Sequence, residues 1–166
     1  MSEQQIQRRS FLKCMAWAGT GIIWTMNGGL LSSSALASGA KRKGNFSFAQ
    51  ISDSHIGFNK DPNHEVKKTF QEAVDKINAL EEQPAFVIHT GDITHLSRPE
   101  EFDTASQILK GVRASEVYFV PGEHDVFTDD GKLYLERFGR GTQGQGWQSF
   151  DYDGVHFVGL INVLNL

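Results

Sequence analysis

Apolar residues follow two spacings along the chain, and these predict strands that alternate with helices. Short apolar runs at 46–52, 85–90 and 116–120 have the length and punctuation of buried strands. Between them, apolar residues recur at helical spacing over 64–80 and again after Pro99. This order favours an α/β fold whose parallel strands are joined by right-handed crossovers.

Capping and turn signals refine this prediction. Asn63 is a candidate cap for the first helix, and Ser97–Glu100 has the form of a capping box with a proline in the first turn. A further short helix is expected over 133–138. Residues 147–152 and 155–161 predict a hairpin that turns at an aspartate-glycine pair. We expect the hairpin to join the parallel strands in one mixed sheet.

The first 37 residues predict an export signal. Arg8 and Arg9 precede a moderately apolar stretch without acids, which ends in the small-x-small pattern of a signal-peptidase site. Interruptions by Gly, Asn, Ser and Thr disfavour the alternative of a stable membrane-spanning helix. We therefore expect handling by the twin-arginine export machinery and a periplasmic location. The expected parts are a signal peptide over 1–37 cleaved near Ala37, a linker over 38–44, and a domain over 45–166.

Charge and cysteine content exclude other classes. The formal net charge is −4, and no run of Lys and Arg suggests a nucleic-acid-binding face. The single cysteine, Cys14, lies inside the predicted signal. The mature chain would therefore have neither a disulfide framework nor a cysteine-ligated zinc site.

Ionisable side chains follow each of the three predicted parallel strands. Asp53 and His55 follow the first strand, Asp92 the second, and Glu123–Asp125 the third. Because parallel strands share one carboxyl-end edge, where ligands bind in open α/β sheets, these groups should gather there. Strand geometry continued through Asp53 and His55 would put both side chains on one side. Carboxylates with imidazoles suit a divalent metal, whereas the alternative is an ordinary solvated sheet edge.

Three short blocks carry a resemblance to a known family. Asp-Ser-His at 53–55, Gly-Asp at 91–92 and Gly-Glu-His-Asp at 122–125 resemble, in this order, the first signature blocks of the calcineurin-like metallophosphoesterases. The resemblance covers roughly residues 46–160. It implies an α/β sandwich with αββα layers, of which this chain holds about the first half. It also implies a hydrolase that attacks phosphoesters with a hydroxide activated by two divalent ions: iron, manganese or zinc.

The resemblance implies roles for individual residues. Asp53 and His55 would hold one metal, and Asp92 would bridge both metals. Glu123 stands where the family has an asparagine ligand of the second metal. His124 would lie beside the scissile phosphate, where it stabilises the phosphate or protonates the leaving alkoxide.

Four histidines lie outside these positions. His95 follows Asp92 by three residues and is a candidate for lining the cleft. His64, near a helix start, is expected to be solvated. His89 and His156 lie within predicted strands and are expected to be packed.

Departures from the family pattern leave three interpretations open. The family has three further histidines in later blocks, whereas this sequence reaches Leu166 before either block. The chain is then a portion of a metal-dependent phosphoesterase, a catalytically incomplete remnant that binds metal or a partner, or an unrelated exported α/β binding protein. With strands for about one of the family's two sheets, it should expose an apolar sheet face.

Overall fold

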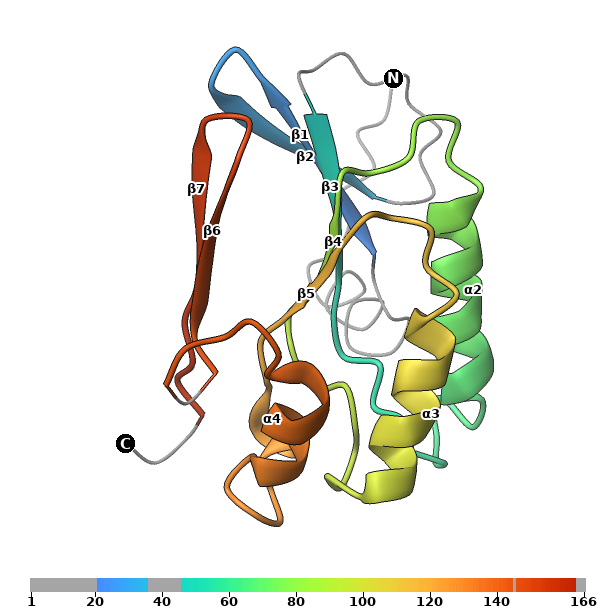
Figure 1. Cartoon of the computed structure of the whole chain (residues 1–166). Coiled ribbons are helices and arrows are strands. Elements are labelled where there is room, and N and C mark those ends of the chain that lie inside the picture. The colour runs from blue at the N-terminus through green and yellow to red at the C-terminus, as the bar shows by residue number, and fades with distance from the viewer. Residues whose placement is uncertain (1–20, 36–45, 145, 164–166) are drawn as a thin grey trace, which may run out of the picture.

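A five-stranded mixed sheet forms the centre of the molecule (Figure 1). The computed structural model describes residues 21–35, 46–144 and 146–163. The elements are β1 (Ile22–Asn27), β2 (Leu30–Ala35), β3 (Phe46–Ile51), α2 (Val66–Asn78), β4 (Val87–His89), α3 (Pro99–Leu109), β5 (Val117–Phe119), the 3-10 turn η1 (Glu123–Asp125), α4 (Lys132–Phe138), β6 (Gln148–Tyr152) and β7 (Val155–Gly159).

The predicted run of parallel strands is confirmed. The sheet order is β2-β1-β3-β4-β5, in which β3, β4 and β5 are parallel and β1 is antiparallel to both of its neighbours. Helices α2 and α3 lie on one side of this sheet, and the β6–β7 hairpin lies on the other (Figure 1). The loops after β3, β4 and β5 therefore leave the sheet at the same end.

The helix-facing core is built by the apolar stripes that the sequence predicts. On α2 the buried residues are Val66, Phe70, Ala73, Val74 and Ile77. Their three- and four-residue spacing keeps one face of the helix against the sheet. Burial of each large side chain contributes about 1.5–3 kcal/mol, so this face anchors α2 and the loop before it.

The β6–β7 hairpin forms a separate two-stranded sheet, so the prediction of one sheet containing it is wrong. Its inner face packs aromatic rings on the larger sheet, with Phe150 5.3 Å from Phe86 and Phe157 5.4 Å from Phe48 between ring centroids. Phe86 and Phe48 are buried, so the expected exposed apolar face is covered at these positions. The hairpin turns at Asp153 and Gly154, both with positive φ, as the aspartate-glycine pair predicts.

The cap predictions are only partly correct. Asn63 lies before the N-cap of α2 and accepts a hydrogen bond from the backbone N–H of Glu65 at 2.9 Å. In α3 the capping carboxylate is Glu101 rather than Glu100, because Glu101 accepts the N–H groups of Leu96 and Arg98. Glu101 sits at the third helical position, which is where a capping box needs its acid.

The sheet also contains two strands from the segment expected to be a signal peptide. Ile23 of β1 is 1% exposed, and the Trp24 indole N–H donates to the Gln50 side chain at 2.8 Å. Arg8, Arg9 and the cleavage position Ala37 lie outside the described residues, as does the linker. Among the helices that are described, none has the length and apolar character to cross a membrane.

Candidate metal centre

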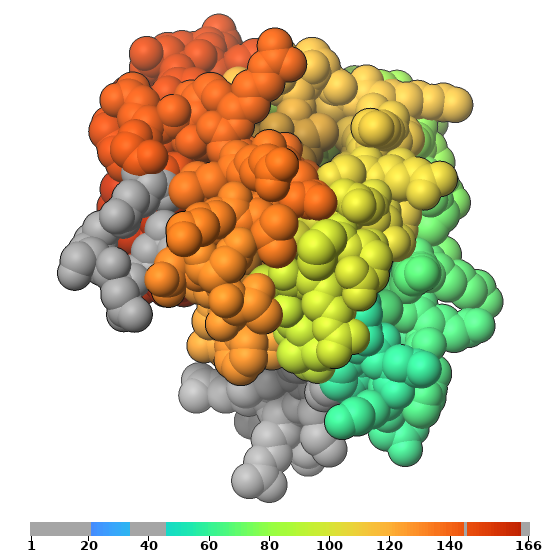
Figure 2. Space-filling model, turned by 60° about the horizontal axis from the view of Figure 1, so that its bottom comes forward, coloured from blue at the N-terminus to red at the C-terminus, as the bar shows by residue number. Residues whose placement is uncertain are grey.

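The three strand-end loops meet at one end of the molecule, and the first two are joined by backbone hydrogen bonds. The N–H groups of Asp53, His55 and Ile56 donate to the carbonyls of Gly91, Asp92 and Ile93 at 2.9–3.0 Å. Figure 2 shows this end: the yellow-green loop after β4 lies between the orange α4 region and the green loop after β3. The signature blocks of the first two loops are therefore held in register.

Left-handed backbone, rather than continued strand, directs the site residues. β3 ends at Ile51, and Asp53, His55 and Asp92 have φ values of 58°, 40° and 52°. Such values are uncommon for residues with a side chain, and they concentrate at functional sites. Asp53 and His55 do lie together, but the expected reason, strand geometry continued through them, is wrong.

Asp53, His55 and Asp92 form a group whose ligand atoms all lie within 4.8 Å of one another. His55 Nε2 is 3.8 Å from Asp53 Oδ1 and 3.6 Å from Asp92 Oδ2. Two atoms that each lie about 2.1 Å from a tetrahedral zinc ion are about 3.4 Å apart. These side chains therefore fit one divalent ion without rearrangement of the backbone.

The charges in this group reinforce one another. The interaction with the His55 ring lowers the pKa of Asp53, and burial opposes this shift. Burial alone would lower the pKa of His55, but Asp53 and Asp92 outweigh it and raise this pKa. The group thus favours a positive charge between its carboxylates. A divalent cation bound there in place of the imidazole proton would supply that charge.

Close backbone contact with the third loop orients Asp92. The backbone N–H of His124 donates to Asp92 Oδ1 at 3.0 Å, which leaves Oδ2 on the His55 side. Gly91 has a φ of 109°, and a Cβ there would lie 2.5 Å from the Gly122 nitrogen. A Cβ on Gly122 would collide with the Asp92 carboxylate. Both glycines are therefore required for this approach.

Asp125 ties the second and third loops together. Its Oδ2 accepts the N–H groups of Ile93 at 3.1 Å and Gly122 at 3.0 Å. Its Oδ1 accepts the N–H of Thr94 at 2.8 Å and the Thr94 hydroxyl at 3.0 Å. The side chain is fully buried, and burial raises its pKa while the backbone N–H groups oppose this shift. The sequence places Asp125 in the third block but did not indicate this role.

His124 has one nitrogen committed and one available. Its Nδ1 donates to the His95 carbonyl at 2.6 Å, so Nε2 is the ring nitrogen that can interact with a bound molecule or ion. Ser97 fixes the same segment, because its hydroxyl donates to the His124 carbonyl at 2.5 Å and accepts the N–H of Phe127 at 2.9 Å. The sequence predicts that Ser97 belongs to a helix cap, and no pattern in it indicates that Ser97 joins two loops.

His89 supports the first loop from inside the sheet. It is fully buried, as expected, and burial lowers its pKa to about 3, so the ring is neutral. The Gly91 N–H donates to Nδ1, so Nε2 carries the proton and donates to the Ser54 hydroxyl at 3.0 Å. Ser54 donates in turn to the Ile93 carbonyl, which fixes the residue between Asp53 and His55.

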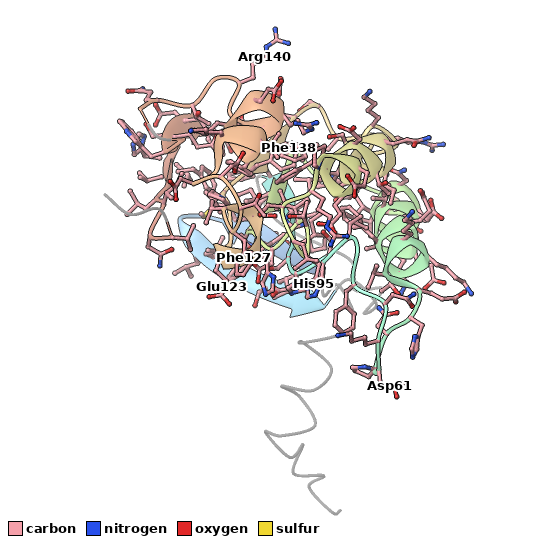
Figure 3. All side chains as sticks on the ribbon, turned by 90° about the horizontal axis from the view of Figure 1, so that it is seen from below. Asp61, His95, Glu123, Phe127, Phe138 and Arg140 are labelled. Atoms are coloured by element: carbon pink, nitrogen blue, oxygen red, sulfur yellow. The ribbon has the colours of Figure 1, made fainter. Side chains whose placement is uncertain are left out.

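Glu123 and the remaining histidines lie in different surroundings. The Glu123 side chain is 81% exposed, with Oε1 4.0 Å from His124 Nε2. It belongs to no three-ligand group among the described residues, and its role as a ligand stays a prediction. Figure 3 shows Glu123 and His95 on the end of the molecule seen from below. His64 is exposed as expected, whereas His156 is exposed and paired with Asp151, so the prediction that it is packed is wrong.

A cavity of about 320 Å³ adjoins the centre. Its lining includes four ionisable side chains of the centre: Asp53, His55, His95 and His124. It also includes residues of α2 and of the loop before it: Phe58, Asn63, Val66, Thr69 and Phe70. A volume of this size is typical of a small-molecule site, so a small molecule has room beside these side chains.

Comparison with known proteins places the chain in a family. The family described as Calcineurin-like phosphoesterase matches residues 46–165. This match covers well over half of the sequence, so the chain belongs to the calcineurin-like phosphoesterase family. The resemblance of the three blocks and the α/β fold that it implies are confirmed.

Two curated relatives match part of the chain. Glycerophosphodiester phosphodiesterase GpdQ of Enterobacter lignolyticus (strain SCF1) is 35% identical over 83 residues, which are 46% of this chain and 28% of the relative. The human serine/threonine-protein phosphatase CPPED1 is 32% identical over 96 residues, 54% of this chain and 30% of the relative. The matched regions are thus less than a third of the relatives' length.

A solved structure is also similar to the chain at low sequence identity. Purple acid phosphatase PPD1 from yellow lupin (Lupinus luteus) superimposes with a TM-score of 0.49 and 13% identity. The superposition covers 85% of this chain and 39% of the lupin protein.

Replacing Asp125 with asparagine tests the link between the loops. We expect Asp125→Asn to lower the free energy of unfolding by about 2–3 kcal/mol, because an amide nitrogen cannot accept the buried N–H groups. Denaturant unfolding measures this loss. Asp151→Asn, at an exposed hairpin position, is the matched control and should change stability by less than about 0.5 kcal/mol. Equal effects of the two substitutions would contradict the role of Asp125.

Proposed function

We propose that this chain is a metal-dependent phosphoric-ester hydrolase with two divalent ions. The observation that carries the proposal is the convergence of Asp53, His55 and Asp92 from two strand-end loops at spacings that fit one ion. Membership of the calcineurin-like phosphoesterase family supports the same chemistry.

The substrate class follows from what the relatives have in common. One is named a phosphodiesterase and the other a phosphatase, so each name describes cleavage of a phosphorus–oxygen ester bond. We infer a phosphoester substrate for this chain as well. Divalent ions would polarise the phosphoryl oxygens and lower the pKa of a bound water. Iron, manganese and zinc all suit a site of carboxylates and imidazoles.

The chain's own residues would then have separate tasks. Asp53 and His55 would hold the first ion, and Asp92, whose carboxylate is oriented by the His124 N–H, would be shared with the second. Glu123 offers a carboxylate oxygen to the second ion, for which its exposed side chain must turn inward. His124 Nε2, the nitrogen left when Nδ1 donates to the His95 carbonyl, would protonate the leaving alkoxide from the doubly protonated ring.

Hydrolysis of bis(4-nitrophenyl) phosphate and 4-nitrophenyl phosphate by the 166-residue chain tests the function. We expect turnover with added Mn²⁺, Fe²⁺ or Zn²⁺ that a chelator abolishes. His124→Gln should lower kcat/KM about 10²–10⁴-fold, as loss of a general acid does. Asp92→Asn should lower both the number of bound metals and the rate.

Asp151 and His156, which form an ion pair on the β6–β7 hairpin, provide matched controls for Asp92→Asn and His124→Gln. Asp151→Asn and His156→Gln alter the same residue types at exposed positions and should leave kcat/KM within about twofold. Absence of turnover with all three metals would contradict the proposal for this chain. If metal is nevertheless bound, that result would favour the catalytically incomplete interpretation.

We propose further that the chain is exported to the periplasm through the twin-arginine machinery. The support is the sequence pattern of Arg8, Arg9 and the small residues before position 38. Cleavage near Ala37 would remove β1 and β2 and leave β3 as an edge strand of the sheet.

Replacement of both arginines by lysine tests the export route. The Arg8→Lys, Arg9→Lys chain should stay in the cytoplasm at its full mass, whereas Arg42→Lys, outside the predicted signal, should be exported and processed normally. Cell fractionation with mass spectrometry gives both readouts. A processed periplasmic double variant would contradict the assignment.

A further inference from the structure

A second cluster of ligand side chains lies beside the carboxylate group and consists only of histidines. His55, His95 and His124 each come from a different strand-end loop, and one nitrogen of each lies within 4.8 Å of the others. Their ring centroids are separated by 5.8 Å for His55–His95, 4.8 Å for His55–His124 and 5.0 Å for His95–His124. This cluster includes His95, to which the family resemblance gives no metal.

Contacts within the protein hold the rings of His95 and His124 in place. His95 stacks on His124 at an interplanar angle of 19° and meets the edge of Phe58 at 5.1 Å. His124 is fixed by its bond to the His95 carbonyl. Ligands already in position lose little side-chain freedom on binding an ion.

Unpartnered polar atoms give an independent sign of a missing partner. The Nδ1 atoms of His55 and His95 are buried and have no hydrogen-bond partner among the described residues. Buried polar nitrogens are normally paired, because leaving one unpaired costs free energy. A metal ion bound at the cluster would supply a partner to such a nitrogen.

Ligand chemistry separates this cluster from the carboxylate group. Imidazole nitrogens suit copper, zinc and nickel, whereas carboxylate oxygens suit manganese and magnesium. The two groups share the His55 ring. The identity of the metal should therefore decide which group is filled.

We propose that His55, His95 and His124 form a three-nitrogen site for a late transition-metal ion such as Cu²⁺, distinct from the Asp53–His55–Asp92 group. The inference does not depend on hydrolysis, because it concerns binding of the ion alone. An ion held there occupies His124 and so withdraws it from the phosphate.

Electron paramagnetic resonance with Cu²⁺ tests the proposal, because pulsed spectra count the imidazole nitrogens on copper. The 166-residue chain carries Cys14→Ser, which removes its one thiol, and receives less than one equivalent of Cu²⁺. We expect three imidazole nitrogens. The carboxylate group would give one, since His55 is its single imidazole. A count of one or two in this chain would overturn the proposal.

Substitutions show which histidines supply the nitrogens that are counted on copper. His95→Gln should reduce the count to two or fewer, whereas Asp53→Asn should keep it at three and abolish hydrolysis if the proposed function holds. His156→Gln, at an exposed histidine outside the cluster, should keep three. Three nitrogens in His95→Gln would overturn the proposal. If His95→Gln does not fold, the NMR signals of the His95 ring in the unsubstituted chain provide the test. They should shift with one equivalent of Zn²⁺, and unshifted signals would contradict the site.

Discussion

The buried carboxylate of Asp125 is the interaction on which the site depends. It accepts four hydrogen bonds, from the backbone of Ile93, Thr94 and Gly122 and from the Thr94 hydroxyl. Two of these residues follow β4 and one follows β5, so a single side chain fixes the distance between two strand-end loops. A buried carboxylate is costly without such donors, and the donors would be unpaired without it. Loop and side chain therefore stabilise each other.

The positions of the ligand residues follow from this link. With the two loops fixed, Gly91 and Gly122 meet backbone to backbone, and the His124 N–H reaches Asp92. The loop after β3 then joins through the bond from the His55 N–H to the Asp92 carbonyl. Left-handed backbone at Asp53, His55 and Asp92 is tolerated because these bonds surround it. The geometry of this candidate metal group is thus a consequence of loop packing rather than of any one of its side chains.

The parallel strands and the convergence of their ends could be predicted from the sequence, because apolar periodicity and strand direction are local properties. That Glu101 is the capping acid could not be predicted, because the start of α3 depends on the loop before it. This loop is held by the bond from Ser97 to the His124 carbonyl. The separate β6–β7 sheet and the pairing of β1 with β3 were also missed. Both depend on long-range contacts, such as the rings of Phe86 and Phe150, which periodicity does not encode. The bonds that join Ser97 to the His124 segment also depend on long-range contacts.

The most direct test of the central claim is anomalous diffraction from crystals of the chain soaked in Mn²⁺. Manganese prefers oxygen-containing ligand sets, so the carboxylate group should be filled rather than the histidine cluster. The account predicts an anomalous peak in contact with Asp53, His55 and Asp92, at ligand distances of about 2.0–2.6 Å. Ordered crystals with Mn²⁺ bound only elsewhere, or with these three side chains turned away from one another, would contradict it.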